Sequence, residues 1–306
     1  MASSLFYFQA YGLRFASDIA MPEFREEHAF ITDVQICRAT LPNFLPEPRK
    51  IMRGCQFADN QVLIRIPEVA TYLIRNGNCI QIDFPANADM RIIRFYLLGI
   101  AMSMLFLQRG TLLLHSSAIR TAQGCVLFAA HSGSGKSTLA AACAKRGFEM
   151  LADDTSFISF ASNGQAQLIA GISHLKLSAE SAAQLNIDEH TLNPLFSGQH
   201  KYVLPLKSTL LNRAFPIEHI FELNPWENTH FFVDKTQGLR KFDIMRKHTS
   251  CEWAIDALGL QAKRFELCTL LHRKVPLSRL FRPQQGFRLD PLVDYLVDKL
   301  NLVASN

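Results

Sequence analysis

An apolar run, a Gly/Ser loop and an Ala-rich helical pattern follow one another near the middle of the chain and constrain its fold most strongly. The apolar run is Val126–Ala130, the loop is His131–Thr138, and the helical pattern is Leu139–Arg146, closed by Gly147. A loop of this kind leads into a helix N-terminus, where inward-facing backbone N–H groups bind phosphate oxygens. The sequence therefore predicts a nucleotide-binding strand–loop–helix unit.

The loop matches the phosphate-binding pattern G-x-x-x-x-G-K-[ST] with one departure, because Ala130 stands where the first Gly is expected. Ala cannot adopt a positive φ cheaply, which leaves the first turn of the loop open. Lys136 would reach the β and γ phosphates, and the Ser137 hydroxyl would hold Mg²⁺. The alternative, a chance Gly/Ser turn, is disfavoured by the strand before the loop and the helix after it. We predict ATP and Mg²⁺ as cofactors, bound by Ser132, Gly133, Ser134, Gly135, Lys136, Ser137 and Thr138.

Two further features stand at informative distances from the loop lysine. The pair Asp153-Asp154 follows Lys136 by 17 residues (153 − 136) and ends a short apolar run, whereas His115 precedes it by 21 (136 − 115). One carboxylate could bind Mg²⁺ and the other could take a proton from a nucleophile, as phosphoryl transfer requires. The alternatives are a solvated turn with a helix cap for the acidic pair, and a core or loop histidine with satisfied hydrogen bonds for His115.

These residues together resemble the HPr kinase/phosphorylase family of P-loop proteins. The matching residues are His115, Ser132 to Ser137, Arg146-Gly147 and Ala152-Asp153-Asp154. The resemblance implies an α/β P-loop kinase core, related in fold to ATP-dependent phosphoenolpyruvate carboxykinase, that phosphorylates a serine hydroxyl. It also implies that Asp153 is the base that activates the serine. Lys136 and His115 then complete the predicted catalytic set, and Ser137 and Asp154 are the predicted metal ligands.

The sequence constrains the phosphate acceptor less than it constrains the phosphate donor. The acidic residue close to an Arg-Gly that HPr kinase/phosphorylase carries downstream of its Asp pair is not found here, which disfavours HPr as the acceptor. The N-terminal layout, with Tyr11-Gly12-Leu13 and Met21-Pro22-Glu23, resembles HPr-kinase-related proteins encoded with ribosomally made peptides, including lasso-peptide precursor kinases. This implies a precursor peptide or protein as partner. The alternatives are HPr, free serine, a carboxykinase-type metabolic enzyme, and a regulator that binds nucleotide without transferring phosphate.

The first ninety residues have a different hydrophobic pattern from the nucleotide-binding segment. Short apolar or alternating runs are punctuated by prolines, and Asn76-Gly77-Asn78 is a hairpin signal between two of them. From residue 88 to residue 108 the pattern becomes helical. We predict a small, mostly β N-terminal domain over residues 1–108 that ends in a helix, followed by a P-loop kinase domain over 109–306.

Composition indicates the cellular compartment of the protein and the classes of partner that it binds. The net charge is +5 without a Lys/Arg cluster, which indicates no nucleic-acid partner. The seven Cys are scattered without a Cys-x-x-Cys pair, as expected of reduced thiols in a cytosolic protein. The apolar run Phe95–Leu107 is shorter than the roughly 20 residues of a membrane span, so it predicts a core helix. We expect a cytoplasmic protein with no membrane partner.

Several predictions fall in the second half of the chain. Residues 193–205 are predicted to form a loop near the site, in which Lys201 is a candidate substrate or phosphate contact. Arg213 is a second candidate, and a solvated surface position is the alternative for both. Residues 242–260 are predicted to form one helix, followed by an apolar core stripe over 265–272. The family resemblance also implies that the protein forms a homo-oligomer.

Overall fold

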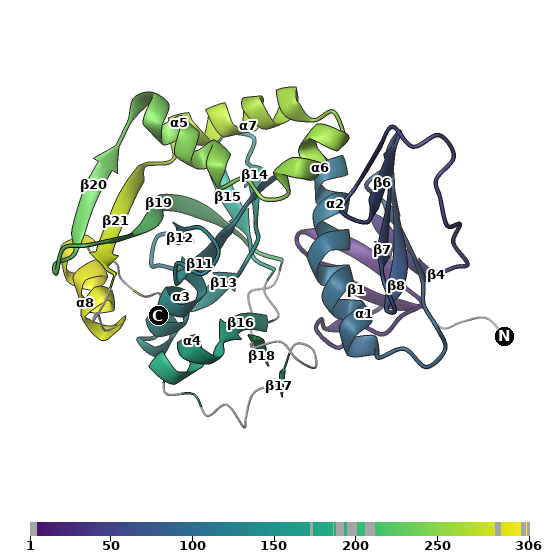
Figure 1. Cartoon of the computed structure of the whole chain (residues 1–306), viewed down its shortest axis with the longest axis horizontal. Helices are drawn as coiled ribbons and strands as arrows, with labels where there is room; N and C mark the ends of the chain where they lie inside the picture. The colour runs from purple at the N-terminus through teal and green to yellow at the C-terminus, as the bar shows by residue number, and fades with distance from the viewer. Residues whose placement is uncertain are drawn as a thin grey trace. The chain divides into compact units, whose positions relative to one another are not determined.

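The structure is a computed structural model of the 306-residue chain. It describes residues 5–171, 174–185, 187, 193–194, 201–205, 212–284, 289–300 and 304. The chain divides into two compact units, one of Met1–Leu113 with Cys251–Glu266 and one of Leu114–Ser250 with Leu267–Asn306. Each unit contains a large mixed sheet with helices (Figure 1).

The N-terminal unit is built on a nine-stranded sheet. Its strands are β1 (Phe6–Ala10), β2 (Leu13–Ser17), β3 (Glu26–Glu27), β4 (Val34–Arg38), β5 (Lys50–Met52), β6 (Cys55–Ala58), β7 (Gln61–Ile66), β8 (Ala70–Arg75) and β9 (Cys79–Asp83). They are ordered β3-β1-β2-β4-β9-β8-β7-β6-β5, and β4 runs parallel to both of its neighbours. The β-rich character predicted for this region is present, and Asn76 and Gly77 take the positive φ of the turn between β8 and β9.

A continuous helical segment closes this unit. It consists of α1 (Met90–Tyr96), a π-helical turn η1 (Leu97–Ala101) and α2 (Met102–Gln108). The Asp89 side chain caps α1 by accepting from the Arg91 N–H, and the Tyr72 hydroxyl of β8 donates to the Ile93 carbonyl at 2.9 Å. The 19 residues Met90–Gln108 are long and apolar enough to cross a membrane by length and composition alone. However, 56% of the window is buried within the protein, as in the core helix of a soluble protein.

The helices after residue 237 differ from the prediction. The expected single helix over 242–260 is two helices, α5 (Gly238–Lys247) and α6 (Glu252–Ala257), because the backbone of Cys251 takes a left-handed φ of 56° between them. Helix α7 (Gln261–Lys274) follows. Its predicted core stripe is also partly wrong, since Phe265 is 63% exposed. The sequence gives no signal that residues 251–266 join the N-terminal unit, where Trp253 packs edge-on against Phe57.

The second unit is organised around a mixed sheet whose central strands are parallel. The strands are β10 (Leu112–Leu114), β11 (Ser116–Arg120), β12 (Cys125–Ala129), β13 (Met150–Ala152), β14 (Ser156–Phe160), β15 (Ala166–Ile169), β19 (Ala214–Trp226), β20 (Phe232–Thr236) and β21 (Leu277–Pro283). Part of its order is β14-β15-β19-β12-β11-β13, with β21 parallel to β19 and β20 antiparallel to β21. Because β12, β19 and β21 are parallel, the residues that follow β12 and the far end of β21 share one sheet edge. Ligands bind at such an edge in many α/β proteins.

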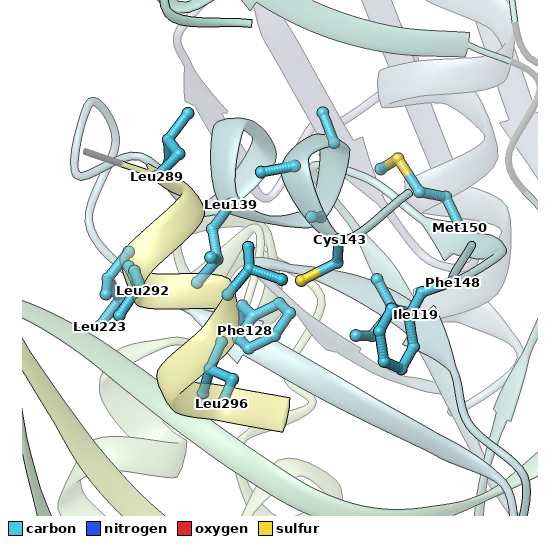
Figure 2. Packing of buried hydrophobic residues seen from close by; sticks show 14 of the residues in the cluster. Ile119, Phe128, Leu139, Cys143, Phe148, Met150, Leu223, Leu289, Leu292 and Leu296 are labelled. Atoms are coloured by element: carbon cyan, nitrogen blue, oxygen red, sulfur yellow. The ribbon is translucent and has the colours of Figure 1, made fainter. Parts of the chain in front are cut away.

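Two helices pack against this sheet and fix the position of the edge where β12 and β21 end. They are α3 (Lys136–Lys145) and α8 (Leu289–Leu300). Figure 2 shows Leu139 of α3 and Leu292 of α8 packed with Phe128 of β12, and all three side chains are fully buried. Each buried side chain of this size contributes roughly 1.5–3 kcal/mol of hydrophobic stabilisation. The packing fixes where α3 begins relative to the end of β12.

A small third sheet lies in the same unit. Its order is β16-β18-β17, formed by β16 (His174–Ser178), β17 (Asn193–Pro194) and β18 (Lys201–Pro205). The loop predicted over 193–205 is therefore wrong at these strands, because residues 201–205 pair with β16. Ser178 caps α4 (Ala179–Gln184) by accepting from the Ser181 N–H at 3.1 Å.

Candidate functional site

The loop between β12 and α3 has the backbone geometry that its glycines suggest. Gly133 and Gly135 adopt φ of 82° and 90°, and Gly135 is the N-cap of α3. Such left-handed conformations are cheap for Gly and costly for other residues. Ala130 is buried and is not among the described residues with positive φ. The departure from the usual first glycine is therefore accommodated without strain.

The loop opens into a cavity of about 480 Å³ in the second unit. Six of the seven predicted nucleotide-binding residues line it, and so do both aspartates of the acidic pair. The seventh, Ser134, contributes its backbone carbonyl to a contact beside the cavity. The lining residues are Ser132, Gly133, Gly135, Lys136, Ser137, Thr138, Asp153, Asp154, Lys176, Leu177, Ser178, Glu180, Ser181, Gln184, Arg282, Gln284 and Leu289.

Asp153 is tied to the loop and to two strands. Its Oδ1 accepts hydrogen bonds from the hydroxyls of Ser137 and Ser117, both at 2.7 Å. Its Oδ2 accepts from the backbone N–H of Lys176 at 3.1 Å. Three donors therefore fix this carboxylate beside the first turn of α3.

Asp154 has different partners and a different backbone. It adopts a left-handed φ of 66°. The Lys176 ammonium lies 2.8 Å from Oδ2, and His115 Nε2 lies 3.5 Å from Oδ1. The hydrogen bond from His115 and the charges of Lys176 and Lys136 outweigh burial and hold the pKa of Asp154 far below its usual range. This carboxylate is ionised at neutral pH.

Lys136 supplies a positive charge at the start of α3. Its side chain is only 7% exposed, and it lines the cavity beside Ser137. Its charge also acts on Asp154. A partly enclosed ammonium at a helix N-terminus is suited to an anionic ligand, because both the charge and the helix dipole favour it.

The cavity lining and the hydrogen bonds to Asp153 include residues that the sequence did not predict. Lys176 and Ser117 reach the acidic pair from β16 and β11, and Ser181 of α4 lies 2.7 Å from the Thr138 hydroxyl. These contacts join residues that are 22 to 43 positions apart in the chain, and no motif spacing predicts them.

Arg282, at the end of β21, also borders the loop. Its Nη2 donates to the Ser134 carbonyl at 3.1 Å, and its Nη1 donates to the Pro283 carbonyl at 3.0 Å. Burial lowers the pKa of its guanidinium, and the nearby Glu180 partly offsets that shift. Arg282 therefore adds a third cation to the cavity wall, after Lys136 and Lys176, from a strand far along the chain.

A buried charged cluster lies at the same sheet edge. Glu222 of β19 is paired in register with Ala129, the last residue of β12. Its carboxylate lies 3.0 Å from His248 Nε2, 3.4 Å from Lys247 Nζ and 3.1 Å from Arg279 Nε. Burial alone would raise the pKa of Glu222, but the hydrogen bonds and charges around it lower that pKa to about 2. The Glu222 carboxylate, which lies beside the beginning of the loop, is therefore ionised at neutral pH.

Of the two remaining candidates, Arg213 lies outside the cavity lining, and for Lys201 the structure describes only the backbone position. Lys201 is paired with Ser178 in the backbone register of β18 and β16, but its side chain lies outside the described residues. Arg213 is exposed just before β19 and does not line the cavity.

The residues present fit a nucleotide-bound Mg²⁺ rather than a closed metal cage. Across the part of the chain that the structure describes, no group of three or more His, Cys, Asp or Glu could hold a metal by itself. Mg²⁺ in nucleotide sites commonly uses one or two protein oxygens together with phosphates and waters. The Ser137 hydroxyl and the Asp153 carboxylate, 2.7 Å apart, are suitable oxygens.

Comparisons with known proteins give a distant structural likeness. No family model matches the chain, and no curated protein matches it. Among solved structures, the HPr(Ser) kinase/phosphatase from Coxiella burnetii is similar at a TM-score of 0.34 and 12% sequence identity. That comparison covers 62% of this chain and 95% of the other.

Proposed function

We propose that the protein is an ATP-dependent phosphotransferase that moves the γ-phosphate of ATP to a serine hydroxyl. The observation that carries this proposal is the single cavity that contains the glycine loop, Lys136, Ser137 and both aspartates. A loop with Lys at a helix N-terminus binds a polyphosphate, and a second carboxylate beyond the metal side provides a proton acceptor.

The chemistry divides among these residues. Ser137 and Asp153 would hold Mg²⁺, which would supply neutralisation of charge on the β and γ phosphates. Lys136 binds the γ-phosphate oxygens, where negative charge builds in the transition state. Asp154 accepts the serine proton as the serine oxygen bonds to phosphorus and the bond from phosphorus to the β–γ bridging oxygen breaks. ADP and the phosphoserine product then leave, and His115 and Lys176 keep Asp154 oriented.

This division reverses the roles that the sequence analysis gave to the two aspartates. There, Asp153 was the base and Asp154 was a metal ligand. The hydrogen bonds from Ser117 and Ser137 to one oxygen of Asp153 support the metal side for that residue. The position of Asp154 beside His115 supports the acceptor side.

For the acceptor, we propose a serine of a peptide or protein, such as a ribosomally made precursor peptide, in the cytoplasm. The support for a macromolecular acceptor is the β-rich N-terminal unit, which contributes none of its described residues to the lining of the nucleotide cavity. HPr, free serine, and nucleotide binding without transfer are the alternatives that an experiment must separate.

The test is mass spectrometry of acceptors after incubation with the protein and MgATP. The panel contains serine peptides, HPr and free serine, and the matched control is Lys136→Ala. We expect a gain of one phosphate on a serine peptide that Lys136→Ala abolishes. Transfer only to HPr or free serine would replace the proposed acceptor. Binding of ATP without any transfer would make the protein a nucleotide-dependent regulator.

A further inference from the structure

We propose that His131 and Lys247, beside His115, form a subsite that binds an anionic group of the phosphate acceptor. This inference rests on the proposed function and deepens it by naming the acceptor class. The acceptor is a hydroxyl compound that carries a carboxylate or another anionic group near the reacting oxygen.

The three basic side chains come from separate parts of the chain. The backbone N–H of His115 donates to the carbonyl of His248 at 2.8 Å, which fixes the end of α5 beside His115. Lys247 is the last residue of that helix. The ring of His131, in the loop, lies 5.5 Å from the ring of His248. The loop and the end of α5 thus meet on the side of the site where His115 contacts Asp154.

This group is distinct from the nucleotide cavity. None of His115, His131 and Lys247 is among the described residues that line the cavity. All three are accessible, since His131 is exposed, Lys247 is 44% exposed and His115 is 27% exposed. Under the proposed function the acceptor hydroxyl approaches Asp154, and His115 Nε2 lies 3.5 Å from that carboxylate. The three side chains are placed to meet that acceptor rather than the nucleotide.

The local charge balance favours an anion. The groups that act most strongly on His131 are Lys247, His248, Glu222 and His115, of which only Glu222 is acidic. Burial, followed by the charges of Lys247 and His248, lowers the pKa of His131. An anion bound beside the ring would relieve this crowding of positive charge.

Among the residues that the structure describes, the buried cluster pairs one carboxylate with more than one cation. One carboxylate, Glu222, faces two permanent cations, Lys247 at 3.4 Å and Arg279 at 3.1 Å. Glu222 is 4% exposed, so these charges interact in surroundings where water screens them weakly. Glu222 therefore anchors Lys247, whose half-exposed ammonium remains accessible to an incoming anion.

The experiment follows binding of sodium sulfate at pH 7 by the histidine ring resonances of the protein in NMR spectra. The loop would itself bind sulfate, so the titration is made on protein saturated with MgADP and, in parallel, on Lys136→Ala. The variants are Lys247→Gln, Lys247→Arg and the matched exposed control Lys235→Gln, and His131→Gln assigns the ring. We expect saturable shifts of His131, with affinity about tenfold weaker in Lys247→Gln and unchanged in Lys247→Arg and Lys235→Gln.

Absence of saturable shifts, or equal sulfate affinity in Lys247→Gln and wild type, would overturn the subsite. Neither result depends on phosphoryl transfer, so failure of the subsite and failure of the kinase proposal remain distinguishable. Matched serine peptides that differ by one Glu-to-Gln change then separate acceptor carboxylates from free inorganic anions. Sulfate should compete with the acidic peptide, and the preference for that peptide should be lost in Lys247→Gln. A peptide preference that survives in that variant would contradict the proposed acceptor class.

Discussion

The hydroxyl of Ser137 donates a 2.7 Å hydrogen bond to Oδ1 of Asp153, whereas Asp154 faces His115 and Lys176 instead. This relationship predicts different defects for the two Asp-to-Asn variants. Asp153→Asn should weaken MgATP binding by tenfold or more, because Mg²⁺ loses a charged oxygen ligand. Asp154→Asn should retain MgATP binding but lower the transfer rate by about 10² to 10⁴, the usual contribution of general base catalysis.

Calorimetric titration with MgATP and with metal-free ATP measures the first defect, and single-turnover transfer measures the second. Asp234→Asn, on strand β20 of the same unit, is a matched control away from the cavity. The opposite pattern, with nucleotide affinity intact in Asp153→Asn and lost in Asp154→Asn, would restore the roles that the sequence analysis gave to the pair.

Much of the nucleotide side of the site could be predicted from the sequence because its residues are close together in the chain. The loop, Lys136 and Ser137 occupy one strand–loop–helix segment, whose periodicity and glycines are local signals. Lys176 and Arg282 could not be predicted in the same way. They reach the cavity through strand pairings and parallel crossovers, which depend on tertiary packing rather than on spacing.

The same limit explains the errors in the second half of the chain. The helical pattern over 242–260 contains no Gly or Pro before Gly259, so nothing local predicts the break at Cys251. The polar residues between 193 and 205 favoured a loop, but pairing with β16 makes residues 201–205 a strand. Tertiary contacts override local preference at both places.

Arg282 is expected to support nucleotide binding from the cavity wall beside the loop, where it contacts the Ser134 carbonyl. Arg282→Ala should weaken ATP binding by about tenfold to a hundredfold, because a hydrogen bond to a charged group contributes roughly 1.5–3 kcal/mol. Arg282→Lys should recover only part of that loss, since an ammonium keeps the charge but not the guanidinium fork that contacts the Ser134 and Pro283 carbonyls.

Titrations with ATP, ADP and AMP measure the effect. The control is Arg273→Ala, at an exposed position of α7. Equal ATP affinity in wild type and Arg282→Ala would exclude Arg282 from the nucleotide site.

The hydrogen bond between Tyr72 and Ile93 is expected to stabilise the N-terminal unit independently of any activity. Tyr72 is fully buried, and its hydroxyl reaches a carbonyl of α1 at 2.9 Å. Tyr72→Phe removes the donor, while the Leu97 N–H still contacts the same carbonyl. The free energy of unfolding should therefore fall by about 1 kcal/mol, the usual net value of one hydrogen bond. Urea denaturation measures this, with Tyr7→Phe on the same sheet as the control, and an equal loss in both variants would count against the bond.

The Glu222 cluster predicts a specific loss of stability in acid. The folded-state pKa of Glu222 is lowered from 4.5 to about 2, so the unfolded chain binds more protons between these values. The contribution is fully present above about pH 4.5 and is lost as the pH falls through 2. It amounts to about 3 kcal/mol in total, of which about 2 kcal/mol should be lost by pH 3.

Glu222→Gln should destabilise the protein by about 3–5 kcal/mol at neutral pH, because Arg279 and Lys247 lose their carboxylate partner. The difference in the free energy of unfolding between wild type and variant should be smaller by about 2 kcal/mol at pH 3, because protonation of Glu222 then removes most of its contribution in the wild type. Denaturant unfolding at pH 7 and pH 3 measures both gaps, and Glu266→Gln on the exposed face of α7 is the control. A gap that stays constant between these pH values would show that Glu222 is not held ionised by His248, Lys247 and Arg279.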